Sequence, residues 1–142
     1  MIRKQSGVIP CFFDTDEMKI ILVTPRWTDE FWIFPKGNIE NGLTATASAA
    51  KEAFEEAGIT GTLFSESVGT YRYEKLGTHY DVTFFVFLVK NIMEDYPEKN
   101  HRKRITATLA QAKNLVRDAE LNILLDQAVR IAQQISSGRG NQ

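Results

Sequence analysis

Three glutamates stand close together near the middle of the chain: Glu52, Glu55 and Glu56. A helix running from Thr44 to Gly58 turns about 100° per residue and places these carboxylates on one flank. They repel one another there, and the helix dipole disfavours anions in the last turns. A divalent cation would remove both penalties, and Mg²⁺ or Mn²⁺ held jointly with substrate phosphates suits such oxygen ligands. A second interpretation stays open, in which the acids are the solvated face of an amphipathic helix.

The helix that must carry these acids has clear start and stop signals. Thr44 can cap its first turn with a hydroxyl, and Gly58 can end it in the left-handed conformation. The loop Pro35-Lys36-Gly37 precedes it with a rigid turn, a cation and a glycine that lets backbone approach a ligand. This loop favours the ligand-binding interpretation. The apolar flank expected to pack on a sheet consists of Leu43, Ala47, Ala50, Ala53, Phe54 and Ala57.

Residues 37–59 resemble the signature of the Nudix hydrolases. That signature runs Gly, five residues, Glu, seven residues, Arg-Glu, an apolar residue, any residue, Glu-Glu, any residue, Gly and an apolar residue. Two positions depart from it, because Leu43 replaces the first Glu and Lys51 replaces Arg. In the family these two side chains commonly brace the loop against the helix, so the departures affect the brace more than the metal ligands. The matching residues are Gly37, Glu52, Glu55, Glu56, Gly58 and Ile59.

The resemblance implies a Mg- or Mn-dependent hydrolase of phosphoanhydride bonds. Glu52 and Glu56 would form the core metal pair, with the Gly37 carbonyl as a further ligand, and Glu55 would be a third ligand or the base that takes the proton of the attacking water. The resemblance thus implies catalytic roles for all three glutamates. A further carboxylate could come from Glu94, Asp95 or Glu98, and substrate phosphates are expected to contact Lys36, Arg26 and Arg104.

The segment from Glu94 to Arg104 is similar to the corresponding part of bacterial diphosphoinositol polyphosphate and diadenosine polyphosphate hydrolases. It has an acidic Tyr-Pro-Glu stretch followed by a basic run. This similarity makes a diadenosine or diphosphoinositol polyphosphate the expected substrate. One alternative is a pyrophosphohydrolase of nucleoside triphosphates or RNA 5′ ends, with Trp27, Tyr71 and Tyr73 as candidates for base stacking. Another is a non-catalytic ligand-binding module of the same fold, to which the departures at the two altered signature positions lend weight.

Hydrophobic patterning around the signature predicts an α/β fold, a Nudix-like α/β/α sandwich with a mixed sheet between helices. The run 79–90 is expected to be a long central strand. The C-terminal helix is expected on the sheet face opposite the signature helix. Strands are expected at 6–13, 19–24, 31–34, 62–66, 68–73 and 79–90, and helices at 44–58, 110–116 and 118–135.

Length and composition predict one domain over residues 1–142, with 136–142 as a flexible tail. The chain has 142 residues, of which 43% are hydrophobic, and a formal net charge of −1. A balanced charge gives no strong sign of nucleic-acid binding and argues against a membrane-surface protein. Cys11 is expected to be a small core residue. We expect a cytoplasmic monomer or homodimer whose partner is a small phosphoanhydride substrate.

Overall fold

The computed structural model describes residues 1–140. One mixed sheet forms the centre of the molecule, with the strand order β4-β5-β1-β2-β6 and with β3 paired to β1. Strands β1 and β5 run parallel, whereas β1 with β2, β2 with β6 and β4 with β5 are antiparallel. The strands are β1 (Ile2–Asp14), β2 (Glu17–Val23), β3 (Lys36–Asn38), β4 (Ile59–Lys75), β5 (Thr78–Ile92) and β6 (Arg104–Thr108).

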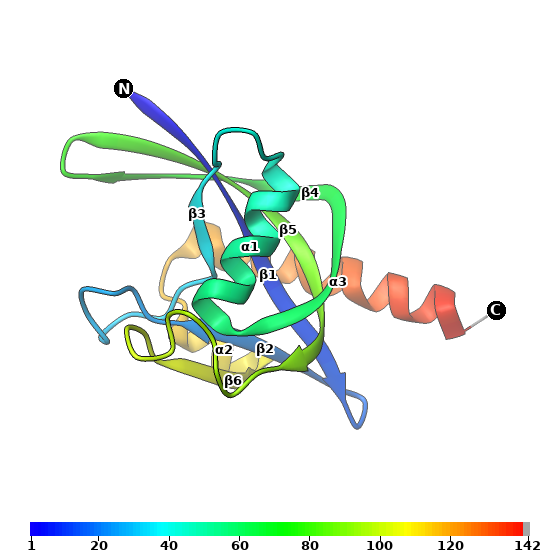
Figure 1. The fold of residues 1–142 in the computed structure, drawn as a ribbon. Coiled ribbons are helices and arrows are strands. Elements are labelled where there is room, and N and C mark those ends of the chain that lie inside the picture. Colours follow the sequence, from blue (N-terminus) through cyan, green and yellow to red (C-terminus); the bar gives the residue numbers. More distant parts are fainter. Residues whose placement is uncertain (141–142) are drawn as a thin grey trace.

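Two helical layers cover the sheet (Figure 1). Helix α1 (Ala45–Ala57) packs on one face, and α2 (Leu109–Leu115) and α3 (Ala119–Gly140) pack on the other. Alternating side chains of β1 divide between the two layers: Val8 joins the core under α1, and Ile9 joins the core under α3. The predicted α/β/α sandwich, with α3 opposite the signature helix, is confirmed.

Two hairpins join neighbouring antiparallel strands of the sheet. The β1–β2 turn uses positive φ at Thr15 and Asp16, and the β4–β5 turn uses positive φ at Leu76 and Gly77. Two such residues in succession match the right-handed twist of a two-residue hairpin. Register shifts near Ser67 explain why β4 resembled two segments in the sequence. The 79–90 run is interior but not central, because β1 lies in the middle of the sheet.

Helix α1 begins and ends where its sequence signals predict. The Thr44 hydroxyl accepts a hydrogen bond from the Ala47 N–H, and Gly58 has a φ of 66°. The predicted buried flank was wrong in part, because Leu43 and Phe54 are each 39% exposed. The side chains that α1 buries are smaller and include one acid: Ser48, Ala49, Ala53, Glu56 and Ala57.

Two strands lie outside the expected ranges. The 31–34 segment contributes only an isolated bridge between Val23 and Ile33, and the strand after it is β3. Strand β6 was not predicted, because a basic run precedes it and only five residues form it. The backbone of 136–140 continues α3, and residues 141–142 of the expected tail lie outside the described residues. Cys11 is buried, as expected, and burial raises the pKa of its thiol to about 12.

Candidate active site

Three carboxylates meet beside the second half of α1. Oxygens of Glu52, Glu56 and Glu98 all lie within 4.8 Å of one another. Of the three acids offered by the 94–98 stretch, the structure brings Glu98 to this cluster. Its N–H donates to the Glu55 carbonyl oxygen at 2.9 Å, which fixes the loop against the helix. The Glu55 side chain is outside the cluster and lies 3.8 Å from the Lys51 ammonium.

Burial makes this cluster electrostatically unusual. Glu56 is only 3% exposed, and desolvation raises the pKa of its carboxyl to about 9. The neighbouring Glu52 adds to that rise, while the Arg102 guanidinium opposes it. Burial also raises the pKa of Glu52. Without a cation, the cluster therefore holds a proton at neutral pH.

Strand β3 passes close to these carboxylates, and a glycine makes this approach possible. A Cβ at Gly37 would lie 2.5 Å from the Glu52 carboxyl carbon, too close for any other residue without a shift. The adjacent Lys36 backbone N–H donates to Glu56 Oε1 at 3.3 Å. Gly37 is therefore placed next to the acids, as a predicted ligand should be.

The residues present fit a hard divalent cation. Mg²⁺ and Mn²⁺ prefer oxygen ligands, and the cluster supplies three carboxylates on a partly buried surface. A cation would also offset the burial and the mutual repulsion that together raise the pKa values of Glu52 and Glu56. This donor set suits the predicted cofactor. It contains Glu98, one of the acids offered as a further ligand, while the side chain of Glu55, offered as a third ligand or as the base, lies outside it.

Arg102 is the site residue that sequence reasoning missed. Its guanidinium lies 3.0 Å from Glu98 Oε1 and 3.5 Å from Glu56 Oε2, and it donates to the Thr24 carbonyl at 3.0 Å. The side chain is only 12% exposed. Arg102 belongs to the run His101-Arg102-Lys103-Arg104. The sequence of that run does not show which of the four side chains turns inward.

The two arginines that were expected to contact phosphates differ in position. Arg26 is 57% exposed, with its guanidinium 3.8 Å from Glu98 Oε1, so it stands at the rim of the cluster. Arg104 instead donates to the carbonyl oxygens of Ala57 and Met93 and stacks over the Tyr96 ring. Arg104 therefore stabilises the C-terminal end of α1, and the contacts that the structure gives it are structural ones.

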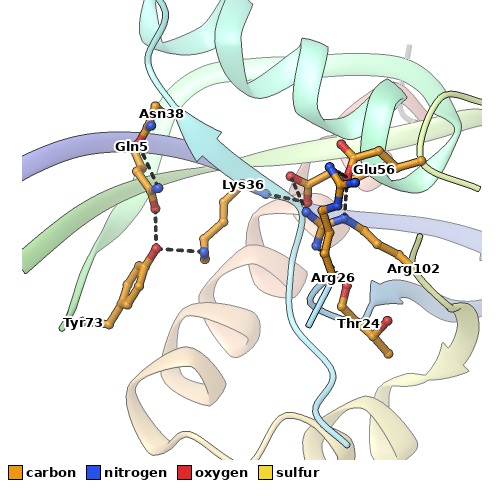
Figure 2. A network of polar contacts seen from close by, with 9 residues as sticks. Gln5, Thr24, Arg26, Lys36, Asn38, Glu56, Tyr73 and Arg102 are labelled. Carbon is orange, nitrogen blue, oxygen red and sulfur yellow. Dashed lines mark hydrogen bonds and ion pairs between the residues drawn. The ribbon is translucent and has the colours of Figure 1, made fainter. Parts of the chain in front are cut away.

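The Lys36 side chain points away from Glu56, the acid to which its backbone N–H donates (Figure 2). Its ammonium donates to the Tyr73 hydroxyl at 3.0 Å, and that hydroxyl donates to Gln5 Oε1 at 2.8 Å. Gln5 in turn donates to Asn38 Oδ1 at 3.1 Å. Burial lowers the pKa of Lys36, and Glu56 partly counters that effect. The network therefore holds the Lys36 ammonium in a defined position, one residue from Gly37 in the sequence.

The loop brace survives the two altered signature positions. The Lys51 ammonium donates to both carboxylate oxygens of Glu40 at 2.8 Å. Glu40 stands three residues before Leu43, so an acid from elsewhere in the loop replaces the missing one. The structure therefore ties Lys51 to the loop that precedes α1.

An aromatic pocket of about 680 Å³ lies beside Lys36. Trp27, Tyr71 and Tyr73, the three candidates for base stacking, all line it. Trp32 is half-buried and forms part of the wall. Trp27 is 66% exposed and packs edge-on against Phe31, with ring centroids 5.6 Å apart. The Tyr71 hydroxyl donates to Asp118 at 2.7 Å, which fixes the opposite wall.

Similar solved structures share this fold. A crystal structure of a C. elegans Ap4A hydrolase binary complex superposes with a TM-score of 0.81 at 21% identity, covering 93% of this chain and 98% of that one. The solution structure of the E. coli ORF135 protein has a TM-score of 0.64 at 18% identity, covering 92% of each chain.

Curated relatives are similar at the level of sequence. Nudix hydrolase 18, mitochondrial, of Arabidopsis thaliana is 29% identical over 82% of this chain and 66% of its own length. Diphosphoinositol polyphosphate phosphohydrolase 2 of Rattus norvegicus is 28% identical over 67% of this chain and 51% of its own length. The chain thus spans between about half and two thirds of these two relatives.

The described residues contain no helix long and apolar enough to cross a bilayer. Several relatives carry mitochondrial or chloroplastic names, so the cytoplasmic location stays a prediction, as does the oligomeric state. The model of the NUDIX domain matches residues 3–126, which confirms the resemblance seen in the signature. This chain therefore belongs to the NUDIX domain family.

Proposed function

We propose that the protein is a metal-dependent pyrophosphohydrolase that cleaves a phosphoanhydride bond of a dinucleoside polyphosphate. The observation that carries this proposal is the aromatic pocket beside the carboxylate cluster. Lys36 belongs to both, because its side chain lines the pocket and its backbone bonds to Glu56. If the base of a nucleotide stacks in the pocket, the phosphates of that nucleotide lie next to Lys36 and the carboxylate cluster. Aromatic walls suit flat bases, whereas an inositol phosphate presents mainly hydroxyls and charge.

Each residue has a defined task in this proposal. Glu52, Glu56 and Glu98, with the Gly37 carbonyl, would hold Mg²⁺ or Mn²⁺. When bound, such an ion polarises phosphate oxygens and lowers the pKa of water. Lys36 neutralises phosphate charge and orients the chain of phosphates. A water oxygen attacks phosphorus, and the anhydride P–O bond breaks with its electron pair leaving on the departing phosphate.

The proton of the attacking water needs an acceptor. We assign this role to Glu55, the signature acid that stands outside the cluster on the same helix. Its carboxylate is partly buried and lies 3.8 Å from the Lys51 ammonium. A carboxylate at this place on α1 is close to the cluster without belonging to it, which is where a base for the attacking water is needed.

A diphosphoinositol polyphosphate is the second candidate substrate. The rat relative's name and the basic side chains near the cluster favour it. Nucleoside triphosphates and RNA 5′ ends are the remaining enzymatic alternative, for which the same aromatic pocket would serve. The non-catalytic alternative loses its main support, because Lys51 and Glu40 keep the loop braced.

A substrate panel tests the proposal. The protein is incubated with Mg²⁺ or Mn²⁺ and with dinucleoside polyphosphates, nucleoside triphosphates, capped or triphosphorylated RNA and diphosphoinositol phosphates, and the products are identified by mass spectrometry. We expect the highest kcat/KM for a dinucleoside polyphosphate. Failure to cleave any compound with either metal would instead support a binding module.

The variant Trp27→Ala separates the two leading substrates. Loss of a stacking surface typically costs about 1–3 kcal/mol per base, so KM for the dinucleoside compound should rise roughly 5- to 150-fold. Phe54→Ala is the matched control, because Phe54 is also an exposed aromatic residue but lies on α1 outside the pocket. An unchanged KM in Trp27→Ala would exclude base stacking at this position.

A further inference from the structure

A second hollow of about 540 Å³ lies on the other side of the 25–27 loop from the aromatic pocket. Pro25 and Trp27 line both hollows, so the two are neighbours separated by one loop. The second hollow differs sharply in chemistry, because it is polar and mostly basic. Its charged or titratable lining residues are Arg26, Lys99, His101, Arg102 and Lys103, against a single acid, Asp29.

This hollow adjoins the carboxylate cluster directly. Arg102 lines it and also contacts Glu56 and Glu98. Arg26 lines it and approaches Glu98 at 3.8 Å. The guanidinium groups of Arg26 and Arg102 therefore lie at the side of the hollow that adjoins the cluster, and the lysines line the same hollow.

Backbone bonds hold the walls of the hollow in place. The Thr24 N–H donates to the Lys103 carbonyl at 3.0 Å, and the Lys103 N–H donates to the Thr24 hydroxyl at 2.9 Å. The His101 N–H donates to the Glu98 carbonyl at 2.9 Å. The basic loop is thus joined to the end of β2 and to the turn that carries Glu98, so the site is largely formed without a ligand.

The lysines are available to an anion. Lys103 pairs with Asp29 at 2.8 Å, but both side chains are more than half exposed, at 66% and 59%. Such a pair contributes only about 0–1 kcal/mol and is easily exchanged. Lys99 forms no ion pair among the described residues. A polyphosphate segment would gain several charge-assisted hydrogen bonds here and disrupt little.

We propose that the basic hollow binds the phosphates of the substrate that lie beyond the scissile bond, on the side away from the stacked base. The proposal rests on the proposed function, and it adds a reason for preferring long phosphate bridges. One nucleoside occupies the aromatic pocket, the bridge crosses the carboxylate cluster, and the distal phosphates lie among Lys99, His101 and Lys103. Short bridges end before reaching these side chains.

Calorimetry of the full chain tests this without turnover. The probes are inorganic tripolyphosphate and AMP, both in the presence of a chelator. The double variant Lys99→Ala/Lys103→Ala should bind tripolyphosphate roughly 10-fold more weakly, the loss expected for charged hydrogen bonds at an exposed site. Its affinity for AMP should stay unchanged. Equal tripolyphosphate affinity in variant and parent would overturn the proposal.

The control variant Lys4→Ala/Lys113→Ala removes the same charge from other surfaces, where these lysines pair with Asp81 and Asp126. A loss of tripolyphosphate affinity as large as that of the test variant would show a non-specific charge effect and also overturn the proposal. With active enzyme, the test variant should have a higher KM than the parent, and the rise should be larger for substrates with longer phosphate bridges. Its kcat should stay constant. If no compound is hydrolysed, the proposed function fails while the tripolyphosphate result still decides the basic hollow.

Discussion

The two faces of the sheet bury different kinds of side chain. Beneath α3 the side chains that the helix contributes to the core are all apolar, and most of them are branched. Beneath α1 the helix contributes small residues, namely Ala49, Ala53 and Ala57, together with the carboxyl group of Glu56. The α3 side chains in the first core are Leu121, Leu124, Leu125, Ala128, Val129 and Ala132.

The difference shows a division of labour within one domain. Small side chains let α1 lie close to the sheet, so that its acids reach β3. Burying a carboxyl group in that layer costs stability unless it is protonated or bound to a cation. The α3 face offsets this cost with apolar burial, which contributes about 25 cal/mol per Å².

The largest expected effect is loss of turnover in Glu56→Gln. Removing a charged ligand from the core of the cluster should lower kcat by roughly 100-fold or more. Because the carboxyl is protonated at neutral pH without a cation, the amide is a close substitute and the fold should survive. Steady-state kinetics measures kcat and circular dichroism checks the fold. The control is Glu66→Gln, at an exposed position of β4. Turnover near the parental rate would remove Glu56 from the site.

A substitution in the core beneath α3 is expected to lower stability and leave turnover unchanged. Leu125 is fully buried, so Leu125→Ala should lower the free energy of unfolding by about 2–5 kcal/mol. The kcat of the folded fraction should stay at the parental value. Urea unfolding measures the loss, and Ile123→Ala, on the same helix but 57% exposed, is the control. A large change in kcat without a change in stability would contradict the division between the faces.

The α1 face should also make stability depend on pH. Folded Glu56 has a raised pKa of about 9, against an ordinary value of 4.5. Between these values the folded state holds a proton that the unfolded state has lost, so the free energy of unfolding falls as pH rises. The slope reaches at most about 1.4 kcal/mol per pH unit. Unfolding in a chelator at several pH values tests this, and Glu56→Gln should have a flatter profile.

The smallest expected effect concerns the brace between Lys51 and Glu40. Both side chains are 44% exposed, so their coupling in a double-mutant cycle should be about 0.2–1 kcal/mol. The cycle uses Lys51→Ala and Glu40→Ala and measures the free energy of unfolding. Zero coupling would show that the contact does not stabilise the loop, and the non-catalytic alternative would regain support.

Local signals predicted much of the fold. Thr44 and Gly58 marked the ends of α1, and the strand and helix periods located most other elements. Strand β6 escaped because five residues with no strict alternation resemble a loop. Phe54 was misplaced because it looked like a core residue, whereas the buried side of α1 carries alanine, serine and the Glu56 carboxyl group.

The site was predicted less evenly. Glu52 and Glu56 followed from helical spacing, but the choice of Glu98 over its acidic neighbours depends on the turn that bonds to the Glu55 carbonyl. Arg102 and Arg104 differ in the partners that they meet. Arg102 pairs with Glu98 and Glu56, whereas Arg104 stacks on Tyr96 and donates to carbonyl oxygens at the end of α1 and after β5. The basic run by itself does not show which arginine takes which position.

The amino-acid sequence by itself determined which groups are available and how they are spaced along α1, because caps and helical periodicity depend on near neighbours. Tertiary structure decided which distant charges meet: Glu98 with the helix acids, Lys51 with Glu40, and Lys36 with Tyr73. Those pairings depend on how loops pack across the sheet. Packing also set the pKa of Glu56, since desolvation exists only after the chain has folded around it.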